Sequence, residues 1–182
     1  MAMSVRASGL LLALCLLPAL GSAQEKEPST IHDYSLNANR DLPITCWKGQ
    51  LERAPGKTMG ELFGDPWPVQ PEPATPDAHS KARLKSIPSI SGILRGLPTQ
   101  SGLVVAAVLV DAEGGALKVE PLCATTEGFD MAVKRLYSRA RFVPATVNGE
   151  PIVSVVGVVQ HFECGRKEGC RIKVRAKARN DG

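Results

Sequence analysis

The feature that most constrains the fold is a pair of β-rich runs joined by a glycine turn. Residues 103–110 read Leu-Val-Val-Ala-Ala-Val-Leu-Val, and β-branched residues of this kind favour a strand. The next five residues, Asp-Ala-Glu-Gly-Gly, are a hairpin turn signal. Residues 116–122 then return with alternating apolar and polar positions. The sequence therefore predicts a β-hairpin over residues 103–122.

One amphipathic helix is predicted after this hairpin. Apolar side chains recur at spacings of three and four from Phe129 to Ala140, which is the period of a helix with one buried face. We expect this helix to cover residues 128–141. Pro144 is expected to end it, because proline lacks the backbone N–H that a continuing helix needs.

A third strand is predicted over residues 152–162, which are strongly β-branched and follow a turn at residues 147–150. Before the hairpin, residues 87–97 suit a short helix at most. The predicted order is (α)ββαβ, an α+β domain in which one helix packs on a three-stranded antiparallel sheet.

The first 23 residues have the pattern of a secretory signal peptide. Arg6 supplies a positive charge, residues 10–20 form a short apolar run, and Gly-Ser-Ala at residues 21–23 suits signal peptidase. The run is too short to span a hydrocarbon core of ~30 Å as a helix. We expect cleavage after Ala23 and export. The alternatives are a lipid anchor at Cys15 and a helix retained in the membrane.

Four cysteines follow this signal, at Cys46, Cys123, Cys164 and Cys170. An even number in an oxidising compartment predicts two disulfides, for which three connectivities are possible. Segment 164–170 has glycines at both ends, so a local Cys164–Cys170 bridge is the simplest choice and leaves Cys46 with Cys123. The competing interpretation is a zinc site, but no Cys-x-x-Cys pair is present and His161 is the only histidine nearby.

An N-terminal segment, residues 24–84, has few regular signals. Residues 65–76 are rich in proline, which predicts an extended, polyproline-like and poorly ordered linker. Upstream, residues 42–47 suit a short strand that a disulfide attaches to the main domain. The chain then divides into a signal peptide (1–23), this segment (24–84), an α+β domain (85–163) and a C-terminal tail (164–182).

The C-terminal tail alternates cations with small apolar residues, so a strand here would place five charges on one face: Arg171, Lys173, Arg175, Lys177 and Arg179. This pattern suits an edge strand that its charges protect from aggregation. The alternative is a basic strip facing anionic lipid or a cell-wall polymer. Because a tight 164–170 connection joins the two, we expect residues 171–178 to pair with the third strand.

Composition and motifs point away from catalysis. The formal net charge is only +4, too small an excess to indicate a nucleic-acid partner. The three histidines share no ligand spacing, and the sequence offers no activated nucleophile, paired carboxylates, cofactor motif or metal cluster. We therefore expect a non-enzyme with no catalytic residue, no metal and no cofactor.

Three pieces of sequence between Gly102 and Phe162 form a distinctive series. The first is Gly-x-Val-x-Ala-x-Val-x-Val-Asp-x-x-Gly over residues 102–114, and the second is the predicted helix. The third is Arg-Phe-x-Pro-Ala-x-x-Asn-Gly-x-Pro-Ile over residues 141–152, followed by alternating valines. Together they resemble the C-terminal domain of TonB, the periplasmic energy transducer of Gram-negative bacteria.

The resemblance implies a binding function. Members of the TonB family bind the short N-terminal box of an outer-membrane receptor by strand addition at the edge of the last sheet strand. The matching edge residues in this chain are Val153, Val155, Gly157, Val159 and His161. We expect a periplasmic, non-catalytic protein associated with TonB-dependent transport, whose partner is such a receptor or another envelope protein.

The resemblance is partial, which leaves a second function open. A full TonB has an uncleaved N-terminal helix that contacts the ExbB–ExbD proton-driven motor, and a long spacer. Here the N-terminal run resembles a cleavable signal, and the proline-rich spacer is short. The alternative function is therefore a structural or accessory envelope protein that uses the TonB-like domain as a scaffold, without coupling to the motor.

Overall fold

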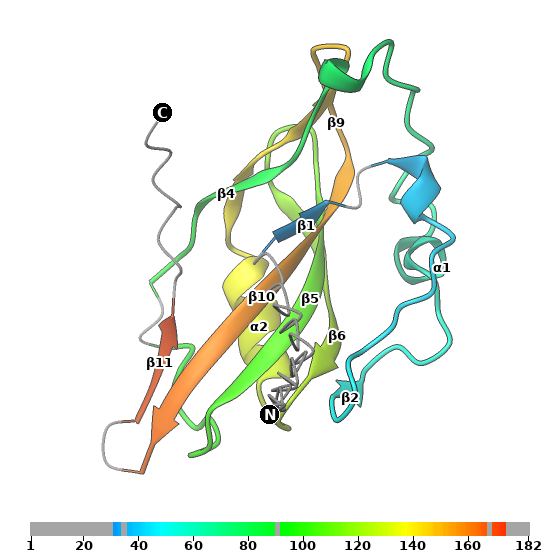
Figure 1. The fold of residues 1–182 in the computed structure, drawn as a ribbon. Coiled ribbons are helices and arrows are strands. Elements are labelled where there is room, and N and C mark those ends of the chain that lie inside the picture. Colours follow the sequence, from blue (N-terminus) through cyan, green and yellow to red (C-terminus); the bar gives the residue numbers. More distant parts are fainter. Residues whose placement is uncertain (1–30, 34–35, 90–91, 167–168, 174–182) are drawn as a thin grey trace, which may run out of the picture.

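The fold is built on a central antiparallel sheet (Figure 1). The computed structural model describes residues 31–33, 36–89, 92–166 and 169–173. In it, β5 (Gly102–Val110) pairs antiparallel with β6 (Ala116–Ala124) and with β10 (Ser154–Gly165). The hairpin predicted from the sequence is confirmed. At its turn, Asp111 Oδ1 accepts hydrogen bonds from the backbone N–H groups of Glu113 and Gly115.

Three short strands enlarge this sheet to six. The strands β1 (Ile31–Asp33) and β11 (Gly169–Lys173) both pair with β10, and β2 (Leu51–Glu52) pairs with β6. The order across the sheet is β1-β10-β5-β6-β2, with β11 beside β10 as well. The strand expected at residues 42–47 is absent there, where only Pro43 forms a bridge, with Thr58. The segment instead meets the sheet at Leu51–Glu52.

The helix α2 (Asp130–Tyr137) covers one face of the sheet and is shorter than the predicted range of 128–141. Its Val133 and Leu136 are fully buried against alternate residues of β5. The helix does not run on to Pro144, because Arg141–Val143 is a strand, β7, that pairs with β4 (Arg83–Ser86). Pairing between these two backbones replaces the last predicted turn of the helix.

A small second sheet joins β3 (His79–Ser80), β8 (Ala145–Val147) and β9 (Glu150–Ile152). The turn from β8 to β9 has positive φ at Asn148 and Gly149, which these two residue types tolerate best. The predicted strand at 152–162 is therefore divided: Ile152 ends β9, and β10 begins at Ser154 and extends to Gly165. The described part of residues 87–97 contains no helix.

The N-terminal segment covers the other face of the sheet. Met59 and Phe63 of helix α1 (Met59–Phe63), together with Trp67, pack against Ala107 and Leu109 of β5. These β5 residues alternate with those that face α2, so the two core clusters lie on opposite faces. Short 3-10 helices, η1 (Asn37–Asn39) and η2 (Pro76–Ala78), precede and follow this cover.

The proline-rich run is held in place rather than free. The exposed fraction of Trp67 is 1%, and the Arg40 guanidinium stacks over its ring at 4.4 Å from the centroid. The Asn37 amide donates to the Gln70 carbonyl and accepts from the Gln70 N–H, both at 2.8 Å. The Asn148 side chain accepts from Ala74 N–H at 2.8 Å. The expectation of a poorly ordered linker was wrong, because a buried tryptophan and amide side chains anchor the run.

Candidate peptide-binding strand

The strand β10 is the candidate binding element, and its outer side is occupied. Its inner side pairs with β5 from Ser154 to Phe162. On the outer side, β1 pairs with Val156–Val158 and β11 pairs with residues 161–165. The open edge expected at this strand is therefore covered over two stretches.

The five predicted edge residues fall in different positions along this outer side. Gly157 lies opposite His32 of β1, and His161 lies opposite Lys173 of β11. Val155 precedes the stretch covered by β1, Val159 lies between the two covered stretches, and Val153 lies before the strand begins. Val155 and Gly157 are buried. An added peptide would therefore interact with the backbone of β10 more than with these side chains.

The cover by β11 agrees with the hairpin predicted from the sequence. Register places Cys164 opposite Cys170 and His161 opposite Lys173. Residues 174–178, the rest of the predicted strand, lie outside the described residues. The cover by β1 was not predicted, because Ile31–Asp33 is too short to give a pattern.

Both predicted disulfides are present. Cys46 and Cys123 are joined with a Cα–Cα distance of 5.7 Å, which attaches the N-terminal segment to β6. Cys164 and Cys170 are joined across the end of the β10–β11 hairpin. Disulfides are typical of proteins in oxidising compartments, and this agrees with export.

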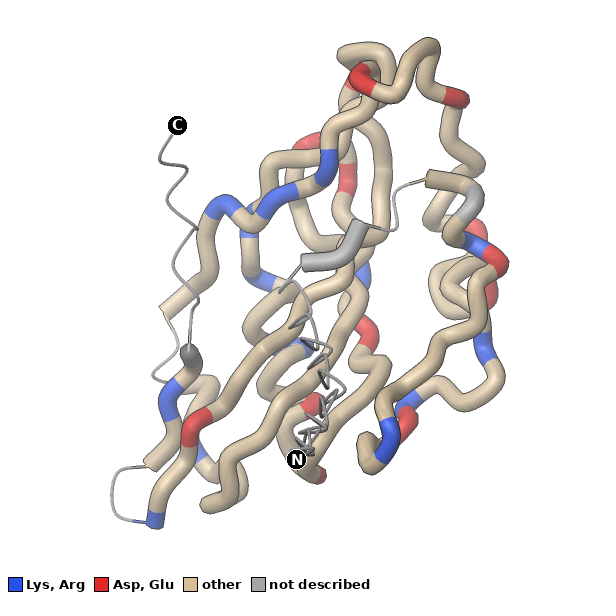
Figure 2. The backbone as a smooth tube through the Cα atoms, in the orientation of Figure 1, with Lys and Arg blue, Asp and Glu red and all other residues tan. Residues whose placement is uncertain are grey.

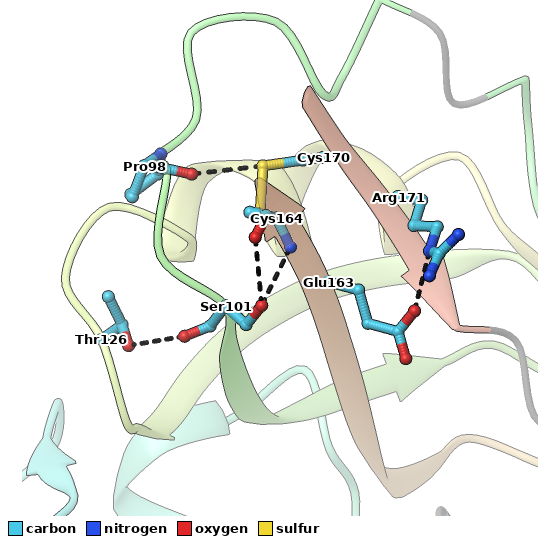
Figure 3. The surroundings of a disulfide bond; sticks show 7 residues. All are labelled: Pro98, Ser101, Thr126, Glu163, Cys164, Cys170 and Arg171. Carbon is cyan, nitrogen blue, oxygen red and sulfur yellow. Dashed lines mark hydrogen bonds and ion pairs between the residues drawn. A yellow bond between two sulfur atoms is a disulfide. The ribbon is translucent and has the colours of Figure 1, made fainter. Parts of the chain in front are cut away.

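Ser101 anchors the hairpin end to the chain that leads into β5 (Figure 3). Its hydroxyl accepts from the Cys164 N–H at 3.0 Å and lies 3.4 Å from the Cys164 carbonyl. On β11, Arg171 Nε donates to Glu163 Oε2 at 2.8 Å. A hollow of about 400 Å³ lies beside this end of the hairpin.

The basic face predicted for the tail is only partly described. Arg171 lies in β11, but its charge is paired with Glu163, and Lys173 is the last described residue of that strand. Arg175, Lys177 and Arg179 lie outside the described residues. In Figure 2 the central strands contain few charged residues, and most Lys, Arg, Asp and Glu residues lie in the segments that surround them. The ion pair fits the edge-strand interpretation of this alternating pattern.

A buried hydrogen-bonded pair ties α2 to β10 between the two covered stretches. The Tyr137 hydroxyl donates to Gln160 Oε1 at 3.1 Å, and Gln160 Nε2 donates to the His161 carbonyl at 2.9 Å. Both side chains are buried, with exposed fractions of 4% each. Burial raises the pKa of Tyr137 from 10.0 to about 12, because the charged phenolate loses its solvation.

This raised pKa predicts a late step in an alkaline titration. The chain has two tyrosines, and the phenolate absorbance of Tyr137 should rise only near pH 12. Between pH 10 and 12 the unfolded chain ionises first, so the folded state should lose about 1.4 kcal/mol of stability per pH unit. Tyr137→Phe should remove the late step. A late step that survives this substitution would contradict the assignment.

The sequence did not reveal the contact of Arg53 with Glu127 and Asp130. Its guanidinium makes two hydrogen bonds to the Glu127 carboxylate, at 3.2 and 3.0 Å, and an ion pair with Asp130 at 2.9 Å. The hydrogen bond from Arg53 lowers the pKa of Glu127. Glu127 precedes α2 and Asp130 begins it, whereas their partner Arg53 lies more than 70 residues earlier in the sequence. The contact fastens the N-terminal segment to the start of α2.

The residues that carry the family resemblance contact one another. The Gly114 carbonyl accepts from the Phe142 N–H at 2.8 Å. A Cβ added to Gly102 would lie 2.7 Å from the Phe129 ring, which stacks on Phe162 with a centroid distance of 4.4 Å. These residues are needed for the fold, and they carry no chemistry of their own.

The described residues contain no group of three or more His, Cys, Asp or Glu side chains that could hold a metal ion. In the same part of the chain, no helix has the length and apolar character needed to cross a membrane. His79 and His161 lie on separate strands, β3 and β10.

The fold and the site define a class of protein. It is a disulfide-bonded α+β protein with mostly antiparallel sheets, in which the long strand β10 pairs with two short strands, β1 and β11. No family model, curated protein or solved structure matches this chain. The similarity to the TonB C-terminal domain therefore depends on the sequence pieces over residues 102–162 alone.

Proposed function

We propose that this chain is a periplasmic, non-catalytic, TonB-like binding module that takes an extended receptor peptide by strand addition to β10. The observation that carries the proposal is the outer side of β10, which already binds two extended segments of the chain itself. A strand that pairs with β1 and β11 in this way can pair with an extended peptide of similar shape that displaces one of them.

The lengths of the strands support exchange. β10 has twelve residues, whereas β1 has three and β11 has five. A longer peptide that replaces either short strand makes more backbone hydrogen bonds than the strand that it displaces. The intact chain should therefore bind weakly, because each binding event first removes a native strand.

The structural or accessory role is the second candidate, and the same cover favours it. Where β1 and β11 stay in place, the outer side of β10 is blocked along most of its length. The domain would then serve as a scaffold for other envelope proteins, without transmitting energy from a motor.

A peptide titration separates the two functions. A peptide with the box of an outer-membrane receptor is titrated against the full exported chain, a chain that ends after Glu163 and lacks β11, and a chain that begins at Leu36 and lacks β1. We expect each truncation to bind roughly tenfold tighter, which corresponds to about 1.4 kcal/mol for the displaced strand.

The control peptide has the same sequence with alternate backbone nitrogens methylated, so it cannot form the strand hydrogen bonds and should not bind. Equal, tight binding to all three chains would contradict the covered strand and favour a working transducer. No binding to any chain would contradict strand addition and favour the accessory role.

A further inference from the structure

The two disulfides lie in different surroundings. Cys123 has an exposed fraction of 3% and belongs to the core cluster under α1 and Trp67, and its half-buried partner Cys46 packs against that cluster. The Cys164–Cys170 bridge is half-buried at the end of a hairpin. Beside it lies the hollow of about 400 Å³, lined by Ser101, Glu163, Cys164, Gly165, Gly169 and Arg171. The second bridge thus has two half-buried cysteines and a hollow beside it, whereas the first has one cysteine in the core.

The neighbours of this bridge distinguish its two sulfur atoms. Cys164 lines the hollow, whereas Cys170 Sγ lies 3.2 Å from the Pro98 carbonyl oxygen (Figure 3). A thiolate that enters the hollow would attack Cys164 Sγ, and Cys170 would be the leaving group. Once protonated, the Cys170 thiol has an acceptor already in place at Pro98. The position of Cys164 at the hollow and of Cys170 beside the Pro98 carbonyl therefore favours reduction of this bridge by a thiol.

The bridge also fixes β11 to β10. In the described part of the chain, β11 pairs with β10 alone, over five residue pairs. Beyond this pairing, its described side chains make the exposed ion pair of Arg171 with Glu163, the contact of Cys170 with Pro98, and the partly buried packing of Ile172 against the core. An edge strand with one partner and so little buried surface is weakly held. The covalent bond at Cys164–Cys170 is therefore its main restraint.

We propose that Cys164–Cys170 is a thiol–disulfide exchange site for a dithiol reductant, and that its reduction releases β11 from β10. One reductant thiolate bonds to Cys164 Sγ, and the S–S bond electrons pass to Cys170, which takes up a proton. The second reductant thiol attacks the mixed disulfide and frees Cys164 as a thiol. Two electrons are transferred, and the reductant is left as a disulfide.

Release of β11 uncovers residues 161–165 of β10. Reduction would thus convert a covered strand into one that accepts a peptide. This consequence for binding rests on the function proposed above, whereas the exchange reaction and the release of β11 do not.

The exchange site is tested on the full exported chain with graded dithiothreitol under native conditions, followed by alkylation and peptide mass mapping. We expect Cys164 and Cys170 to be alkylated at roughly tenfold or more lower reductant concentration than Cys46 and Cys123. Reduction of both bridges together, or of Cys46–Cys123 first, would overturn the proposal.

Release of β11 is tested by amide hydrogen exchange of the selectively reduced chain and of the double variant Cys164→Ser with Cys170→Ser. Exchange over residues 161–173 should become roughly tenfold faster or more in both, with β5 and β6 still protected. The matched control is Glu163→Gln, which weakens the ion pair but keeps the bridge, and it should exchange like the parent chain. Unchanged exchange in the reduced chain would overturn the proposal.

The receptor-box peptide then separates the two proposals. If the chain that ends after Glu163 binds it tightly and the reduced chain does not, reduction does not open the strand and the present inference fails. If no form of the chain binds it, but selective reduction and faster exchange occur, the function proposed above fails and the exchange site stands.

Discussion

Replacing Cys46 and Cys123 together by alanine is expected to lower the free energy of unfolding by about 4 kcal/mol. This bridge closes a loop with a sequence separation of 77, and the entropy that a disulfide removes from the unfolded chain grows with loop length. It is also the covalent link between the N-terminal segment and β6. The loss should therefore appear first as detachment of that segment from the sheet.

Tryptophan fluorescence can measure the detachment of the N-terminal segment from the sheet. Both tryptophans of the chain, Trp47 and Trp67, lie in the N-terminal segment, and Trp67 is buried. Urea unfolding followed by tryptophan fluorescence reports the cover, whereas far-ultraviolet circular dichroism reports the sheet. In the parent chain the two transitions should coincide. In the double alanine variant the fluorescence change should come at a lower urea concentration.

The matched control replaces Cys164 and Cys170 by alanine. Its loop has a sequence separation of 6, so the same entropy argument gives a cost of about 2 kcal/mol. The fluorescence and circular dichroism transitions should stay together. An equal or larger loss in this control would contradict the role assigned to the Cys46–Cys123 bridge.

Gly114→Ala is expected to lower the free energy of unfolding by about 3 kcal/mol or more. Gly114 has φ +83°, and an added Cβ would lie 2.1 Å from the carbonyl oxygen of Phe142. Two costs therefore add: the strained backbone conformation and the movement of β7 away from the turn. Urea denaturation of the variant, followed by circular dichroism, measures the sum.

Gly149→Ala is the control for the backbone term. Gly149 has φ +85°, and nothing lies within 4 Å of an added Cβ. Only the conformational cost remains, about 1 kcal/mol. If the two variants lost the same stability, the contact between Gly114 and Phe142 would have no energetic weight.

The elements that the sequence predicted correctly are those with their own periodic pattern. β5 and most of β10 are rich in β-branched residues, β6 alternates apolar and polar residues, and α2 has helical spacing. The helix was predicted too long because Ala140 continues the spacing, although the next residues pair with β4. β1 and β2 are two or three residues long. Such strands form only because a long neighbour supplies the pairing partner.

The features of the candidate site that depend on residues close together in the sequence could be predicted. The short Cys164–Cys170 loop predicted both a bridge and a hairpin, and both are present. The proline-rich run was misjudged, because prolines indicate an extended chain but do not show whether Trp67 finds a buried site. The cover of β10 by β1 places Ile31 opposite Val158, and no local pattern reveals a pairing between such distant residues.

Because β1 and β11 both pair with β10, the topology affects the order in which the strands of the sheet can form. Val158 pairs with Ile31, from near the beginning of the chain, and His161 pairs with Lys173, from near its end. Because a chain is synthesised from its N-terminus, β1 stays unpaired until β10 has been made. The β5–β6 hairpin, whose contacts are local, can form earlier. Completion of the sheet is therefore a late event in folding, and the apolar strands need protection from aggregation until then.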